Sequence, residues 1–183
     1  MNVRILFSLV VLLALGLAGG ILLSTQAMGN LTSDEIFARA KSGDWVEIKG
    51  IVQADYSVLA VEFKFLGSGM GDDDWELTGK VRAASPLKSE IHVASVVAQI
   101  TANTKLNKPI KGFDDIQAEM LVKLEGTYRD EGIFVAKDVS SKAAQLKDKP
   151  QLAQIIEAVG RIGHVDEERR TIVVMGIQVH ITD

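Results

Sequence analysis

The feature that most constrains the fold is a repeat of two sequence types that alternate along the chain. Type B occupies residues 122–139, and an offset of 76 residues places its Gly126 on Gly50 without a gap. Type A occupies residues 76–101, and an offset of 81 residues repeats it at 157–182 with six identical residues. The order is therefore B, A, B, A, with one complete A-B unit in the middle. The alternative is that unrelated β-hairpins share glycines and alternating Val and Ile by composition alone.

An isolated hairpin buries too little apolar surface to be stable in water, so each A or B segment needs a partner. We therefore expect a mainly β protein of small β-barrel units. Residues 75–140 form one complete unit. Residues 33–66 and 157–183 are half-units, and we expect them to pair into a second, circularly permuted barrel. The alternative is that both half-units add to the edges of one continuous sheet.

The remaining segments connect these units. The capping box Thr32-Ser-Asp-Glu35 predicts a short helix over about residues 33–41. Residues 67–74 form an acidic, glycine-rich linker, and residues 141–156 form a connector rich in Lys, Ala and Gln. Within type A we expect one long strand, Glu90–Thr101, with a kink at Ala94-Ser95.

Residues 1–28 predict the compartment. Arg4 precedes 19 uncharged residues, 5–23, which is longer than a typical signal core and just long enough to span a bilayer. Thr25-Gln-Ala27 is an acceptable cleavage site. Both a cleaved signal peptide and a retained membrane anchor are open. Either one predicts export, to the periplasm or to the inner membrane with the remaining chain facing the periplasm.

The middle of the chain also carries a recognisable pattern of Gly and β-branched residues. Its elements are Gly79-Lys-Val81, Ile100-Thr-Ala-Asn-Thr104, Glu125-Gly126, Gly132 and Ala136. This pattern resembles the bacterial family called domain of unknown function 5666, over about residues 75–139. The resemblance implies a small OB-like β-barrel that is usually exported and often repeated. It implies no activity.

Composition argues against several classes of function. The net charge is −4 and aromatic residues make up only 5% of the chain, so no nucleic-acid surface is expected. The chain has no cysteine. No nucleophile elbow, phosphate-binding loop or dinucleotide motif occurs. We therefore expect no enzymatic activity and no cofactor.

Metal binding is also not expected. Asp72, Asp73 and Asp74 are weak candidates for a cation site, but they lack the spaced ligands of a calcium loop, which favours a solvated linker. The three histidines, His92, His164 and His180, are not spaced as a ligand pair.

The aromatic residues are the best candidates for binding. Trp45, Tyr56, Trp75 and Tyr128 are the four polar-tipped aromatic residues of the chain, and the two tyrosines lie near the turns of the two B hairpins. Together these observations predict a binding or scaffolding module with an envelope protein partner, attached to the membrane through residues 5–23 if these are retained. The alternative is a carrier of a small ligand or metal ion that uses a barrel mouth.

Overall fold

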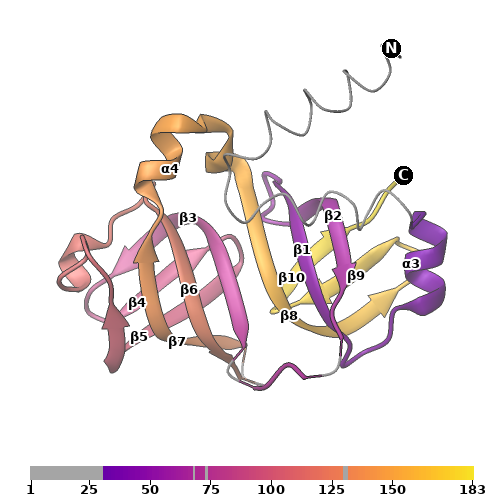
Figure 1. Ribbon diagram of the computed structural model, residues 1–183, viewed down its shortest axis with the longest axis horizontal. Helices are drawn as coiled ribbons and strands as arrows, with labels where there is room; N and C mark the ends of the chain where they lie inside the picture. The colour runs from indigo at the N-terminus through magenta and orange to yellow at the C-terminus, as the bar shows by residue number, and fades with distance from the viewer. Residues whose placement is uncertain (1–30, 68, 73, 130–131) are drawn as a thin grey trace, which may run out of the picture.

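The computed structural model describes residues 31–67, 69–72, 74–129 and 132–183 (Figure 1). The fold is mainly β, with ten strands in one hydrogen-bonded sheet and a few short helices. The strands are β1 (Trp45–Val52), β2 (Val58–Phe65), β3 (Trp75–Ser85), β4 (Glu90–Val93), β5 (Val96–Leu106), β6 (Leu121–Tyr128), β7 (Ile133–Ser141), β8 (Ile155–Asp166), β9 (Thr171–Val174) and β10 (Ile177–His180). The helices are α3 (Ser33–Arg39), η1 (Phe113–Asp115), α4 (Ala143–Asp148) and η2 (Pro150–Gln154).

The strands form two five-membered circuits that lie side by side (Figure 1). One, the middle unit, consists of β3, β4, β5, β7 and β6, and β6 pairs back to β3. The other, the terminal unit, consists of β8, β9, β10, β2 and β1, and β1 pairs back to β8. Each unit has one parallel pairing, β5 with β7 in the middle unit and β10 with β2 in the terminal unit. The other pairings within each unit are antiparallel.

The terminal unit joins the two ends of the chain. β1 pairs with β8 over seven residues, from Trp45 opposite Arg161 to Ile51 opposite Ile155. β2 meets β10 where Val58 lies opposite Val179. The N-terminal hairpin and the last three strands therefore share one set of hydrogen bonds, although the whole middle unit separates them in sequence.

The repeat extends to irregularities of the backbone. The register shifts at Lys49/Gly50 in the β1–β2 hairpin and at the equivalent Glu125/Gly126 in the β6–β7 hairpin. Both glycines are required sterically, because a Cβ atom at either position would collide with the facing strand's backbone. A second pair of shifts occurs between Val81 and Ala83 in β3 and between the equivalent residues of β8. Equivalent bulges indicate that the two units have the same local construction.

The expected long strand over Glu90–Thr101 is wrong. Ala94 and Ser95 form a tight turn, and β4 and β5 on either side of it pair antiparallel. Ala94 has a φ of 48°, and its equivalent Met175 has a φ of 52°. A turn of two residues preserves the alternation of inward and outward side chains. The sequence pattern therefore continues through the turn as if the strand were unbroken.

A short antiparallel ladder between β3 and β8 joins the two units. It contains three residue pairs, with Leu77 opposite Ala158 at its centre. These two residues are equivalent under the offset of 81, so the ladder relates each unit to the other by a local two-fold axis. Ser95 and Gly176 are also equivalent, and the Ser95 hydroxyl lies 3.5 Å from the Gly176 carbonyl oxygen. The junction therefore has two symmetry-related ends.

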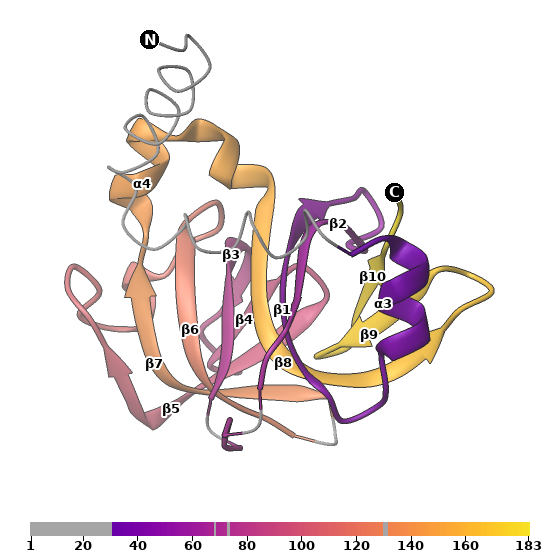
Figure 2. The same ribbon diagram turned by 45° about the vertical axis from the view of Figure 1, so that its right-hand side comes forward.

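Helix α3 lies against the terminal unit near the C-terminal residue (Figures 1 and 2). The predicted capping box is present, and the helix ends two residues before its expected limit. Ile36 and Phe37 are buried in the core. The guanidinium of Arg170 stacks on the Phe37 ring at 4.7 Å, and the Asp183 carboxylate accepts a hydrogen bond of 2.8 Å from the Ser33 N–H.

The connector holds α4 and η2 and lies at the opposite end of the molecule from the linker between the units (Figure 2). The predicted signal or anchor, residues 1–28, lies outside the described residues. Within the described part of the chain, no helix combines the length and the apolar character needed to cross a membrane.

Candidate binding groove between the two units

Three of the four predicted aromatic residues meet at one end of the junction. Trp45 begins β1, Trp75 begins β3 and Tyr128 ends β6. The ring centroids of Trp45 and Trp75 are 5.0 Å apart, and those of Trp75 and Tyr128 are 5.5 Å apart. Tyr56 is not part of this cluster. It lies in the β1–β2 turn, where the Arg82 guanidinium stacks on its ring at 4.5 Å.

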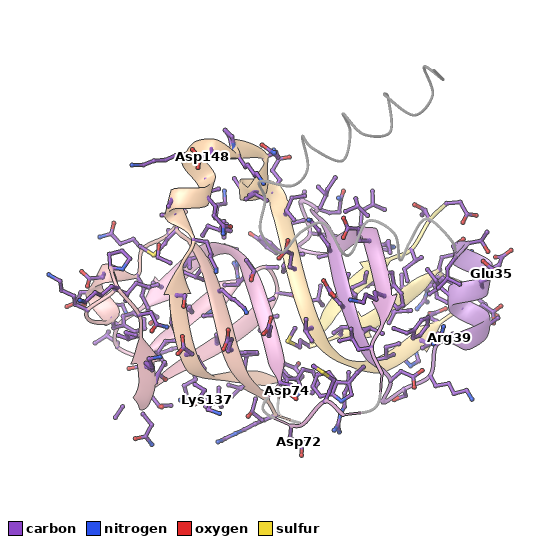
Figure 3. The ribbon with its side chains drawn as sticks, in the orientation of Figure 1. Glu35, Arg39, Asp72, Asp74, Lys137 and Asp148 are labelled. Atoms are coloured by element: carbon purple, nitrogen blue, oxygen red, sulfur yellow. The ribbon has the colours of Figure 1, made fainter. Side chains whose placement is uncertain are left out.

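An open groove of about 740 Å³ lies beside this cluster, and we call it the junction groove. It is lined by Ser42, Gly43, Asp72, Trp75, Thr127, Tyr128, Arg129, Arg161, Ile162, Gly163, Val173, Met175 and Gly176. Both units contribute, because the end of the β6–β7 hairpin faces the β9–β10 turn. Asp72 and Asp74 lie on the segment that crosses this end of the molecule (Figure 3).

Glycines allow the aromatic side chains to pack at the junction. A Cβ atom at Gly160 would lie 2.6 Å from a ring carbon of Trp75, and one at Gly176 would lie 3.0 Å from the Tyr128 hydroxyl. Trp75 is therefore buried against the backbone of β8, whereas Tyr128 is half-buried. Burial raises the pKa of the Tyr128 hydroxyl, which keeps this side chain a neutral donor and acceptor over a wider pH range.

Charged side chains form the rim of the junction groove. The Arg161 guanidinium stacks on the Trp45 ring at 5.2 Å and binds the Asp72 carboxylate at 2.8 Å. The Asp72 side chain is 83% exposed, so this ion pair is screened by water and contributes little to stability. Arg129 also lines the groove and is exposed. The rim therefore carries hydrogen-bonding groups that a ligand can reach.

The other end of the junction is the symmetry-related counterpart, and its cavity is smaller, about 220 Å³. Here the Lys80 ammonium binds the Glu119 carboxylate at 2.6 Å, and Arg82 stacks on Tyr56. The offset of 76 aligns the groove residues Tyr128 and Gly43 with Val52 and Glu119, respectively. The offset of 81 aligns Trp75 with Ile156, Arg161 with Lys80, and Gly163 with Arg82.

This comparison explains why the two ends differ in size. Glycines in the junction groove stand where the smaller counterpart has Glu119 and Arg82. Aromatic residues stand where the counterpart has Ile156 and Val52. Gly43 and Gly163 would not have been selected by reasoning on single residues. The signal that identifies them is the difference between aligned repeat positions.

A third cavity, of about 280 Å³, lies on the sheet face beneath the connector, but its charges are largely paired. Lys123 binds Glu125 at 2.8 Å and Glu76 at 3.1 Å, and Lys49 binds Glu157 at 3.4 Å. Partial burial disfavours the charged form of Lys123, but the hydrogen bonds that its ammonium donates to Glu125 and Glu76 outweigh this effect and raise its pKa. The pairing accounts for these side chains as cross-strand contacts.

The metal candidates do not assemble into a site in the described part of the chain. Asp72 pairs with Arg161, and the Asp74 carboxylate accepts a hydrogen bond from the Gly71 N–H. Asp73 lies outside the described residues. His92 contacts Arg82 at 3.2 Å, and no three His, Asp or Glu side chains among the described residues are grouped to hold a metal ion.

Comparison with known proteins identifies the family. The model of the family described as Domain of unknown function (DUF5666) matches residues 21–64 and 78–140. The chain belongs to this family. Within the described residues, the DUF5666 match includes α3, the β1–β2 hairpin and nearly all of the middle unit, and it is interrupted at the linker. The resemblance inferred from Gly79, Gly126 and Gly132 is thereby confirmed. No curated protein and no solved structure matches the chain at a significant level.

Proposed function

We propose that this DUF5666 protein is a non-enzymatic binding protein of the cell envelope, and that it binds its partner or ligand in the junction groove. The difference between the two ends of the junction carries this proposal. Because a local two-fold axis relates them, a purely structural junction would be served by the same packing at both ends. Instead, Lys80 and Glu119 pair at one end beside a cavity of about 220 Å³, whereas the other end has a groove of about 740 Å³ beside three aromatic side chains.

Gly163 leaves space at the rim of the groove, because a Cβ atom there would meet only the Val173 carbonyl oxygen, at 3.7 Å. A cleft of this kind, apolar at its floor and polar at its rim, is typical of ligand sites. Binding accounts for the difference between the two ends.

The proposal includes the finer fold. We propose that each unit is an OB-like barrel, because each has five strands in a closed circuit of pairings with a single parallel pair. The OB fold is a five-stranded Greek-key barrel that binds ligands with its loops and one strand face. The junction groove includes Thr127, Tyr128 and Arg129 at the loop between the fourth and fifth strands of the middle unit, one of the loops that OB folds use.

The cellular location remains part of the proposal. The uncharged segment at residues 5–23 supports export, as either a cleaved signal or a retained anchor. The binding partner would then be a component of the envelope.

The side chains of the groove support binding rather than catalysis. Among the described residues that line it, none is His or Cys, and the Ser42 hydroxyl donates a hydrogen bond of 3.0 Å to the Gly163 carbonyl. A serine nucleophile needs a neighbouring base, which these residues do not supply.

A small-ligand carrier is the second candidate, and one observation favours it. The groove volume of about 740 Å³ falls within the roughly 300–1,000 Å³ of small-molecule sites. A carrier would be stabilised by its ligand in proportion to the logarithm of ligand concentration, by roughly 2.7 kcal/mol at a hundredfold excess over Kd.

Site-specific photo-cross-linking tests the binding role. A photoreactive amino acid at Arg129, in native envelopes, should capture a defined partner or ligand. The same group at Leu87, which is fully exposed in the β3–β4 turn away from the groove, should not. Gly163→Arg places at this position the residue that lines the smaller counterpart, and it should abolish the cross-link. Equal capture at both positions, or capture unaffected by Gly163→Arg, would contradict the assignment of the groove.

A further inference from the structure

We infer that the junction groove binds a neutral oligosaccharide. The inference rests on the proposed binding function and adds the chemical class of the ligand. A sugar ring presents flat patches of C–H groups and a periphery of hydroxyl groups. A site for it needs an apolar, preferably aromatic, surface together with donors and acceptors around it.

The floor of the groove provides the apolar surface. Tyr128 is half-buried, so part of its ring is accessible to a ligand, whereas Trp75 and Met175 are 8% and 3% exposed and belong to the core beside it. Aromatic rings combine a large apolar area with an electron-rich face. Tyr128 also has a hydroxyl that reaches the β9–β10 turn beside Gly176, so it offers both an apolar body and a polar tip.

The rim provides the hydrogen-bonding groups. Arg161 and Arg129 are donors, Asp72 is an acceptor, and the Thr127 hydroxyl can do both. Stacking on Trp45 holds the Arg161 guanidinium in place, so less conformational entropy is lost when a ligand binds it. Planar carboxylate and guanidinium groups can each engage two neighbouring hydroxyl groups.

Charge and solvation argue against two alternatives. The groove is lined by two arginines and one aspartate, which is not the extended basic surface that a nucleic acid requires to release counterions. A wholly apolar ligand would remove water from Arg161 and Asp72 without replacing their hydrogen bonds. A neutral molecule with many hydroxyl groups and apolar faces satisfies both the floor and the rim.

The test uses the tryptophans of the protein. The chain has two, Trp45 and Trp75, and both belong to the cluster at the groove, so intrinsic fluorescence reports on this site. The full chain is titrated with maltohexaose, cellohexaose and N-acetylchitohexaose. We expect a saturable change in emission with at least one of them, unaffected by 0.5 M salt because the ligand is uncharged.

Variants locate the binding. Tyr128→Ala should weaken binding roughly tenfold or more, the effect of losing one aromatic contact with its hydrogen bond. Gly163→Arg should abolish it, and because Gly163 is exposed with no close side-chain neighbour, this variant should fold normally. Tyr56→Ala is the matched control, since Tyr56 lies at the smaller counterpart, and it should bind as the unaltered protein does.

The outcomes separate this inference from the proposed function. Saturable binding that Gly163→Arg abolishes supports both. If none of the three sugars changes the emission, or if dodecathymidylate does so instead, the oligosaccharide assignment is wrong. In that case a cross-link at Arg129 that depends on Gly163 still supports a binding groove, whereas its absence removes both.

Discussion

Replacing Ile181 with Ala should loosen the N-terminal hairpin, which lies more than one hundred residues away in sequence. Ile181 follows β10 and is 1% exposed within the core. The substitution removes three carbon atoms, worth about 2.4 kcal/mol at about 0.8 kcal/mol each. The cavity left behind brings the total to roughly 3 kcal/mol. Hydrogen exchange measures this as a loss of more than a hundredfold in amide protection.

The matched control is Ile100→Ala in the middle unit. Ile100 aligns with Ile181, and the N–H groups of both donate to equivalent carbonyls, those of Ser89 and Arg170. Ile181→Ala should reduce protection over residues 45–65 and 155–180, and Ile100→Ala over residues 75–141. If amides in Val46–Val52 keep full protection in Ile181→Ala while β8 to β10 lose theirs, the two chain ends do not form one cooperative unit.

Three further changes probe the junction, the sheet face and the helix. Gly160→Ala forces the Trp75 ring to move, so the protein should lose about 1–3 kcal/mol in urea unfolding and its emission should shift to the red. Lys123→Met leaves two glutamates directly opposite each other, which should cost about 1 kcal/mol at low salt and be recovered by adding Glu125→Gln. Hydrogen bonds from the backbone N–H and the hydroxyl of Ser33 lower the pKa of Asp183 in the folded protein. The Asp183 carboxylate therefore contributes its full stabilisation above about pH 3.8, and this stabilisation is lost as the pH falls through the lowered pKa of the folded state. Asp183→Asn should flatten the acid limb of a pH–stability curve, and an unchanged limb would exclude this contact.

The repeat could be predicted from the sequence because the backbone geometry requires the same residue types at equivalent positions. Gly50 and Gly126 recur since each bulge brings the facing strand too close for a side chain. The turn at Ala94-Ser95 could not be predicted from the sequence. It contains neither Gly nor Pro, and its two residues leave the alternation of the flanking strands in phase.

The candidate site was only partly accessible from sequence. Trp45, Trp75 and Tyr128 are recognisable as amphipathic aromatic residues, but their meeting depends on the β3–β8 ladder, which no local pattern encodes. Tyr56 has the same residue type and a similar turn position. The structure places it at the other end of the junction, because equivalent positions lie on opposite sides of a two-fold axis.

The joining of the chain ends also sets the order in which the protein can fold. All strands of the middle unit are contiguous, so it can form once residue 141 is available. The β1–β2 hairpin is synthesised earlier, but its partners β8 to β10 are completed only near residue 180. At about 5–20 residues per second, the hairpin waits roughly 6–23 s with both edges unpaired. Such edges favour association between chains, so the interval before the last strands arrive is when this protein is most exposed to aggregation.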